Sequence, residues 1–167
     1  MNMTRKRWVV LIASVAVLGL VVLWWIATEN GRRLDRHVQR ALERYEQAFA
    51  RDGARATPTP LRRDGFSPAL GVPSAEKVTV NQDGRTLTVE FIGRKTTGPC
   101  GSDYTARAVE SEHAALIVVE EHPHEWVRAC TDEGYRRQAT VQLSRPLDGR
   151  TVLEAMRGMP VPVDLPR

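Results

Sequence analysis

The residues best suited to chemistry form a short run between positions 120 and 125, which reads Glu-Glu-His-Pro-His-Glu. His122 and His124 would share one face of an extended chain, and His113 lies a few residues earlier. Imidazoles and carboxylates are common ligands of divalent metal ions. Pro123 interrupts the run and no third ligand follows at a helical spacing, so a solvated acidic loop is the favoured interpretation. A metal site or an active site built from the three histidines is the alternative.

No other motif in the sequence predicts catalysis. The serines lie in no nucleophile-elbow sequence, and there is neither a phosphate-binding loop nor a dinucleotide fingerprint. We therefore expect a protein that is not an enzyme and needs no cofactor. Trp126, next to the acidic run, is a candidate anchor for a protein partner, because an aromatic among polar residues is a common recognition element. The alternative is that Trp126 closes one end of the fold.

The two cysteines, Cys100 and Cys130, both fall in predicted loops, which suits a crosslink between neighbouring ends of a sheet. A disulfide would place this part of the chain in an oxidising compartment. A reactive or metal-binding thiol is the alternative, but the sequence contains no Cys-x-x-Cys spacing.

Residues 8–27 contain no charge and are long enough, at about 1.5 Å per residue, to cross a bilayer as one helix. Trp8, Trp24 and Trp25 supply interfacial aromatics at the two ends. A cleaved signal peptide is the alternative, but its apolar region is usually about 7–15 residues long. The basic residues within 1–7 abut the apolar run, and together with the cysteines they favour a cytoplasmic tail and an extracytoplasmic C-terminal domain.

Residues 28–52 are predicted to form an amphipathic juxtamembrane helix, since apolar residues repeat at spacings of three and four from Leu34 onward. A helix packed on its own domain or along the bilayer surface is favoured, and a homodimeric coiled coil through residues 34–49 is the alternative, because the repeat covers barely two heptads. The proline- and glycine-containing residues 53–75 are predicted to be a linker that spaces the domain from the membrane.

Residues 76–167 are predicted to fold as a small β-rich extracytoplasmic domain, an antiparallel sandwich or roll with one disulfide. The segments around 78–80 and 87–91 alternate apolar and polar residues about an Asp-Gly turn, which predicts a hairpin. Residues 114–120 are apolar on both faces, as in a central strand buried on both sides. Further strands are predicted in the segments 104–110, 135–143 and 150–153.

The charge distribution argues against a nucleic-acid-binding protein. The chain carries a formal charge of +4, but residues 76–167 hold twelve basic and fourteen acidic side chains, a balance of −2. Binding to phosphate groups requires clustered lysine and arginine on one face. Nucleic acid is therefore not a predicted partner. The predicted partners are the bilayer, through residues 8–27, and a protein of the envelope, because a tethered domain is present without a catalytic motif.

An arginine-rich composition, one N-terminal anchor and the pattern of residues 86–163 resemble a group of small, uncharacterised actinobacterial envelope proteins. The segments that carry the resemblance are LTVEFIGRKTTGPCGSDYTARAVES and RACTDEGYRRQATVQLSRPLDGRTVLEAMRGMPVPV. The resemblance implies a cysteine-bridged extracytoplasmic domain and assigns no activity. The sequence as a whole predicts a single-pass cell-membrane protein whose β-domain is a protein-interaction or scaffolding module.

Overall fold

The computed structural model describes residues 31–61, 72–125, 130–131 and 133–165. From His37 onward these residues belong to one compact unit, and residues 31–36 fall in a separate N-terminal unit. The described part is mainly β, with one disulfide, as the sequence predicts. Among the described residues no helix is long and apolar enough to cross a membrane. The predicted transmembrane segment, residues 8–27, lies outside the described residues.

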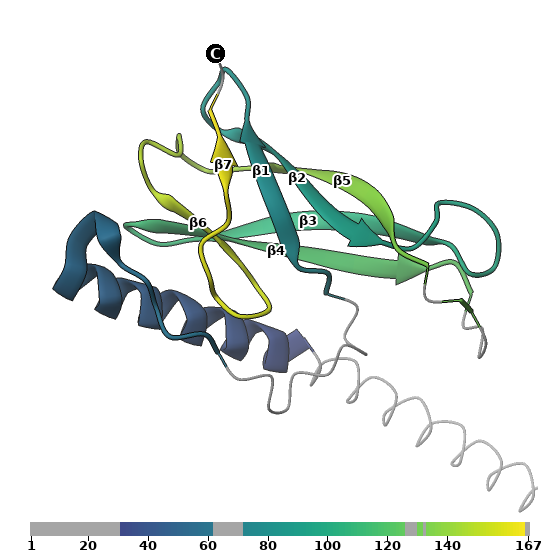
Figure 1. Ribbon diagram of the computed structural model, residues 1–167, viewed down its shortest axis with the longest axis horizontal. Helices are drawn as coiled ribbons and strands as arrows, with labels where there is room; N and C mark the ends of the chain where they lie inside the picture. The colour runs from purple at the N-terminus through teal and green to yellow at the C-terminus, as the bar shows by residue number, and fades with distance from the viewer. Residues whose placement is uncertain (1–30, 62–71, 126–129, 132, 166–167) are drawn as a thin grey trace, which may run out of the picture. The chain divides into compact units, whose positions relative to one another are not determined.

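Two sheets form the β-domain (Figure 1). The first has the strand order β5-β2-β1-β7 and the second the order β3-β4-β6. Their bounds are β1 Ala75–Val80, β2 Thr86–Gly93, β3 Ser102–Glu110, β4 Ala114–Pro123, β5 Tyr135–Gln142, β6 Thr151–Glu154 and β7 Val163–Asp164. The chain crosses between the sheets before β3, β5, β6 and β7, so sequence neighbours are often in opposite layers.

The predicted hairpin is confirmed as the antiparallel pair β1–β2. Asp83 caps its turn by accepting hydrogen bonds from the backbone N–H groups of Arg85 and Thr86 at 2.9 and 2.8 Å. Gly84 has φ +67°, a left-handed conformation that glycine adopts without steric cost. The turn residues therefore fix the register that turns Leu87 and its alternate neighbours inward.

The prediction of a purely antiparallel domain is wrong. β7 pairs with β1 in parallel, and β6 pairs with β4 in parallel. Both parallel strands reach their partners after the chain has visited the other sheet, so no tight hairpin turn dictates their direction. Because the chain passes from one sheet to the other between these strands, each sheet contains both parallel and antiparallel pairs.

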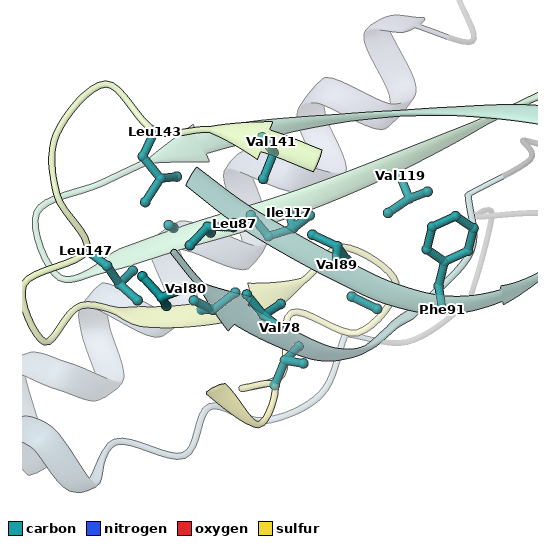
Figure 2. Close-up of a cluster of buried hydrophobic side chains, with 14 residues drawn as sticks. Val78, Val80, Leu87, Val89, Phe91, Ile117, Val119, Val141, Leu143 and Leu147 are labelled. Atoms are coloured by element: carbon teal, nitrogen blue, oxygen red, sulfur yellow. The ribbon is translucent and has the colours of Figure 1, made fainter. Parts of the chain in front are cut away.

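The main apolar core lies between the two sheets (Figure 2). Burial in β2 alternates strictly, with Leu87, Val89 and Phe91 facing the core. Ile117 and Val119 of β4 face them from the second sheet (Figure 2). The other labelled core residues come from β1, from β5 and from the segment after β5: Val78, Val80, Val141, Leu143 and Leu147. Figure 2 shows the side chains of β1 and β2 meeting those of β4, which is the arrangement of a β-sandwich.

β4 is buried on both faces from Ala114 to Val119, which confirms the predicted central strand. Ala115, Ile117 and Val119 belong to the core between the sheets, so Leu116 and Val118 face the opposite way and need a second cover. Residues 31–52 are helical, and from His37 onward this helix supplies that cover. Its buried side chains in this unit include Val38, Ala41, Leu42, Tyr45 and Ala48.

The apolar stripe of the helix is therefore used within the chain, as the favoured interpretation expects. Tyr45 donates a hydrogen bond from its hydroxyl to Thr151 Oγ1 of β6 at 2.6 Å. His37 Nε2 lies 3.0 Å from the carbonyl oxygen of Ala155. A homodimeric coiled coil through residues 34–49 would have to displace these intramolecular contacts.

The predicted linker, residues 53–75, is described only at its two ends, and both ends join the domain. Leu61 is buried and its N–H donates to the carbonyl oxygen of Arg157 at 2.9 Å. Val72 is buried, and Ala75 already belongs to β1. These two ends are therefore part of the domain rather than a spacer. Leu61 and Val72 are apolar, and leaving them in water would cost free energy.

Candidate functional site

The three candidate histidines do not form one site. His113 precedes β4, whereas His122 and His124 lie at its far end, and a strand of this length separates its ends by roughly 30 Å. In the described part of the chain no group of three histidine, cysteine or carboxylate side chains could hold a metal ion. The alternative of a metal or active site that combines His113, His122 and His124 therefore has no geometric basis.

His113 belongs to the contact between helix and sheet. Its Nδ1 lies 2.7 Å from Glu46 Oε2, its backbone N–H donates to Glu46 Oε1 at 3.0 Å, and its ring stacks on Phe49 with centroids 3.9 Å apart. Burial by itself raises the pKa of Glu46, but hydrogen bonds from Ser111 and His113 outweigh it, and the net pKa is lowered. The cluster fastens the helix to the start of β4.

His122 and His124 each contact a different side chain of β3. His122 Nε2 lies 2.8 Å from Thr105 Oγ1. His124 Nε2 lies 3.2 Å from Asp103 Oδ2, and its Nδ1 lies 3.3 Å from the carbonyl oxygen of Gly98. These contacts tie the end of β4 to β3. The interpretation of residues 120–125 as a solvated loop is wrong for residues 120–123, which pair with β3 as the last part of β4, because the strand continues beyond its apolar stretch.

The predicted disulfide is confirmed. Cys100 and Cys130 are joined, with their Cα atoms 5.7 Å apart, and connect the loop after β2 to the loop after β4. Trp126, the candidate partner anchor, lies outside the described residues and stays a prediction.

The buried charged groups have structural partners. Arg150, 8% exposed, pairs with Glu110 at 2.7 Å and also donates to backbone carbonyls of the loop before β6. Burial alone raises the pKa of Glu110, yet hydrogen bonds from Ser144 and Arg150 lower it overall. Glu154 accepts backbone N–H groups of Met156 and Arg157 and so holds the turn after β6. These hydrogen bonds satisfy the buried charges and hold the loops before and after β6.

A surface cavity of about 670 Å³ opens at the end of the sandwich that carries the β1–β2 turn. Leu147, Val161, Val163 and the 69% exposed Leu165 contribute to its apolar lining. The cavity lies beside β7, which has only two residues and leaves the apolar core partly uncovered at this end of the sandwich.

The edge strand of the first sheet, β5, lies close to β3, the edge strand of the second sheet. β5 is the terminal strand of the order β5-β2-β1-β7 and runs without a bulge beside β2 from Tyr135 to Gln142. Leu143 N–H donates to the carbonyl oxygen of Arg85, and hydrogen bonds alternate along an antiparallel pair. The odd-numbered residues of β5 therefore bond to β2. The backbone groups of Arg136, Gln138, Thr140 and Gln142 turn toward the free edge.

Two adjacent arginines give this edge a positive charge. The side chain of Arg136 is 86% exposed, and its Nη1 makes a long ion-pair contact of 3.9 Å with Glu90 Oε2. Arg137 places its guanidinium over the ring of Tyr104, 5.6 Å from the centroid. The Nε of Arg137 is buried and makes no hydrogen bond within the described structure. Together with Glu90 and Gln138, the two arginines line a surface hollow of about 400 Å³.

Tyr104 supports this edge from the second sheet. Its ring packs edge-on against Phe91 with centroids 4.9 Å apart, and its hydroxyl accepts the backbone N–H of Arg94 at 2.6 Å. Burial raises the pKa of Tyr104. The hydrogen bond and the packing against Phe91 hold the ring of Tyr104 in place, and the guanidinium of Arg137 lies over this ring near the start of β5.

Fold and site together define a disulfide-linked, two-sheet β-sandwich covered on one face by a helix, with an uncovered cationic edge. Comparison of the chain with protein-family models, with curated proteins and with solved structures finds no match. The residues of the β5 edge were not among the site candidates drawn from the sequence. Their signal was present as Arg136-Arg137 within an alternating strand, but sequence alone does not tell which strand lies at an edge.

Proposed function

We propose that this chain is a single-pass membrane-anchored envelope protein whose extracytoplasmic β-sandwich binds a protein partner and so acts as an interaction or scaffolding module. The anchor is inferred from the apolar residues 8–27. The disulfide supports an oxidising compartment, because disulfides persist there and are rare in the cytosol. The resemblance to small actinobacterial envelope proteins points to the same location.

The observation that carries the binding role is that each sheet ends in a long strand that is hydrogen-bonded to another strand on one side only. β5 has eight residues and β3 has nine, and both stand at the end of their sheets. Proteins usually shorten, bulge or cover such edges, because an exposed row of backbone donors and acceptors pairs with other chains. Two long edges on one small domain therefore favour association with a partner.

The test is capture on intact cells with a membrane-impermeant amine crosslinker. The chain has three lysines, Lys6, Lys77 and Lys95, and only the last two belong to the predicted outside domain. We expect Lys77 or Lys95 to attach to one discrete protein, and the Lys77→Arg/Lys95→Arg variant to lose that product. Modification of these lysines only after lysis would overturn the topology. Their modification on intact cells without any attached protein would overturn the binding role.

A further inference from the structure

We propose that the free edge of β5 is a docking site for an extended, acidic segment of a protein partner, which adds to the first sheet as a further strand beside Arg136 and Arg137. This inference rests on the proposed binding function and names the surface and the chemistry of the partner. Strand addition of this kind takes affinity from main-chain hydrogen bonds and specificity from alternate side chains.

The backbone geometry makes β5 a template for pairing. Four alternate residues from Arg136 to Gln142 direct their N–H and C=O groups away from β2, and the pairing with β2 is continuous along the strand. The strand contains no proline, glycine or bulge, and its only charged residues are two arginines, which oppose pairing with a basic strand and favour pairing with an acidic one. An added strand would meet an uninterrupted row of donors and acceptors.

Charge determines which segment fits. β5 carries two arginines and no carboxylate, whereas β3, the other long edge, carries Asp103, Glu110 and Arg107. Arg107 of β3 already pairs with Glu120 at 2.9 Å. At β5 the only ion pair is the long contact of Arg136 with Glu90, and the cationic edge is therefore the one with unmatched charge in the described fold.

Arg136 and Arg137 lie on opposite faces of β5, because successive side chains of a strand alternate. Glutamate or aspartate side chains at adjacent positions of an added strand would then reach one arginine each. The hollow beside both arginines gives such carboxylates space. Guanidinium–carboxylate pairs are among the stronger side-chain hydrogen bonds, since both groups are charged.

A second copy of the chain is the competing occupant. Two β5 strands could pair antiparallel, but each would bring two arginines and no carboxylate, so the positive charge of the edge would be doubled rather than neutralised. Charge complementarity therefore favours an acidic partner, and self-association is an outcome of the test.

The probes are two fluorescein-labelled octapeptides with capped ends, Val-Glu-Glu-Val-Val-Glu-Glu-Val and the same sequence with lysine in place of glutamate, so that adjacent charges fall on both faces of an added strand. Binding to the full-length chain in detergent micelles is measured by fluorescence anisotropy at low and moderate salt. We expect the acidic peptide to bind at least about tenfold more tightly than the basic one, a ratio that corresponds to roughly 1.4 kcal/mol. Equal binding of the two peptides would overturn the proposed charge selectivity.

Variants separate backbone pairing from charge. Gln138→Pro removes an outward N–H and is expected to weaken binding of the acidic peptide about tenfold, whereas Gln138→Ala, which keeps the N–H, should bind as the wild type does. Arg136→Glu/Arg137→Glu should reverse the preference to the basic peptide. Arg55→Glu, an exposed charge reversal outside the sheets, is the control and should change neither affinity by more than about twofold.

Should Gln138→Pro fail to fold, N-methylation of the acidic peptide on one set of alternate residues tests the same hydrogen bonds on the native protein. One of the two alternate sets should abolish binding and the other should preserve it. If both methylated peptides bind as well as the parent, strand addition is wrong. A dimer whose formation excludes the peptide would assign the edge to a second copy instead.

The proposed function and this inference fail separately. A partner that crosslinks on cells to both the wild type and the folded Gln138→Pro variant leaves the binding role intact and refutes the β5 edge. Selective peptide binding without any cellular partner supports the edge and refutes the proposed binding role.

Discussion

Removal of the Cys100–Cys130 bridge is expected to destabilise the domain by a calculable amount. The bridge closes a loop with a sequence separation of 30 residues. In the chain-entropy account such a crosslink restricts the unfolded chain and stabilises the folded state by about 3.6 kcal/mol at 25 °C. Since small domains have only about 5–15 kcal/mol of stability, the double variant Cys100→Ser/Cys130→Ser should unfold far more easily but still fold.

The assay is equilibrium unfolding in urea, followed by circular dichroism, for the oxidised wild type and the double variant. With a slope of about 1.5–2 kcal/mol per molar, the midpoint should fall by roughly 2 M. The wild type in a thiol reductant is the control and should match the variant, which separates loss of the bridge from the serine side chains.

A loss below about 1 kcal/mol would contradict the entropic reasoning. In that case the two loops would already be restrained in other ways in the unfolded state. The native loop after β2 does have local bonds, since Gly101 N–H donates to Gly98 and Ser102 N–H donates to Lys95, both at 2.9 Å.

Three further predictions concern packing and the attachment of the helix. Gly158→Ala should lower the free energy of unfolding by about 1–3 kcal/mol, because Gly158 has φ +69° and an added Cβ would lie 2.9 Å from Ala41 Cβ on the helix. Thermal unfolding of the variant and the wild type measures this loss. Phe91→Ala should cost about 3–5 kcal/mol in urea unfolding, whereas Ile92→Ala, on the outer face of the same strand, should cost less than about 1. Because the pKa of Glu46 is lowered in the folded state, its contribution is complete above the ordinary carboxyl pKa and is lost as the pH falls through the lowered value. Glu46→Gln should therefore weaken the loss of stability below about pH 4.5, as measured by urea unfolding at a series of pH values.

The elements that sequence predicts well are those specified by local pattern. Leu87, Val89 and Phe91 recur at every second position beside an Asp-Gly turn, and the structure places them as expected. The bridge between Cys100 and Cys130 followed from two cysteines in predicted loops. The strand pattern is contained in a few neighbouring residues, and a chain with two cysteines allows only one intramolecular disulfide.

The parts that sequence could not predict depend on contacts between distant segments. β7 has two residues, too few for any periodicity, and its parallel pairing with β1 is set by where the preceding turn leaves the chain. The apolar stripe of the helix that spans residues 31–52 fitted either a second helix or a sheet, and the choice between them depends on where the fold presents a second apolar surface. The free edge of β5 is likewise a property of sheet order, which no single segment encodes.

The apolar pattern of the strands nevertheless explains which side of the domain remains available. β4 has apolar residues at six consecutive positions, so both of its faces need a cover, and the second sheet and the helix supply one each. β2 and β5 alternate, so burial of one face satisfies them, and their polar face and the outer edge of β5 remain in water without an energetic cost. A helix over the first sheet would have to desolvate Glu90, Arg136 and Gln138, whereas over the second sheet it buries Leu116 and Val118. The same pattern that directs the helix to β4 therefore leaves the polar face of β2 and β5 exposed.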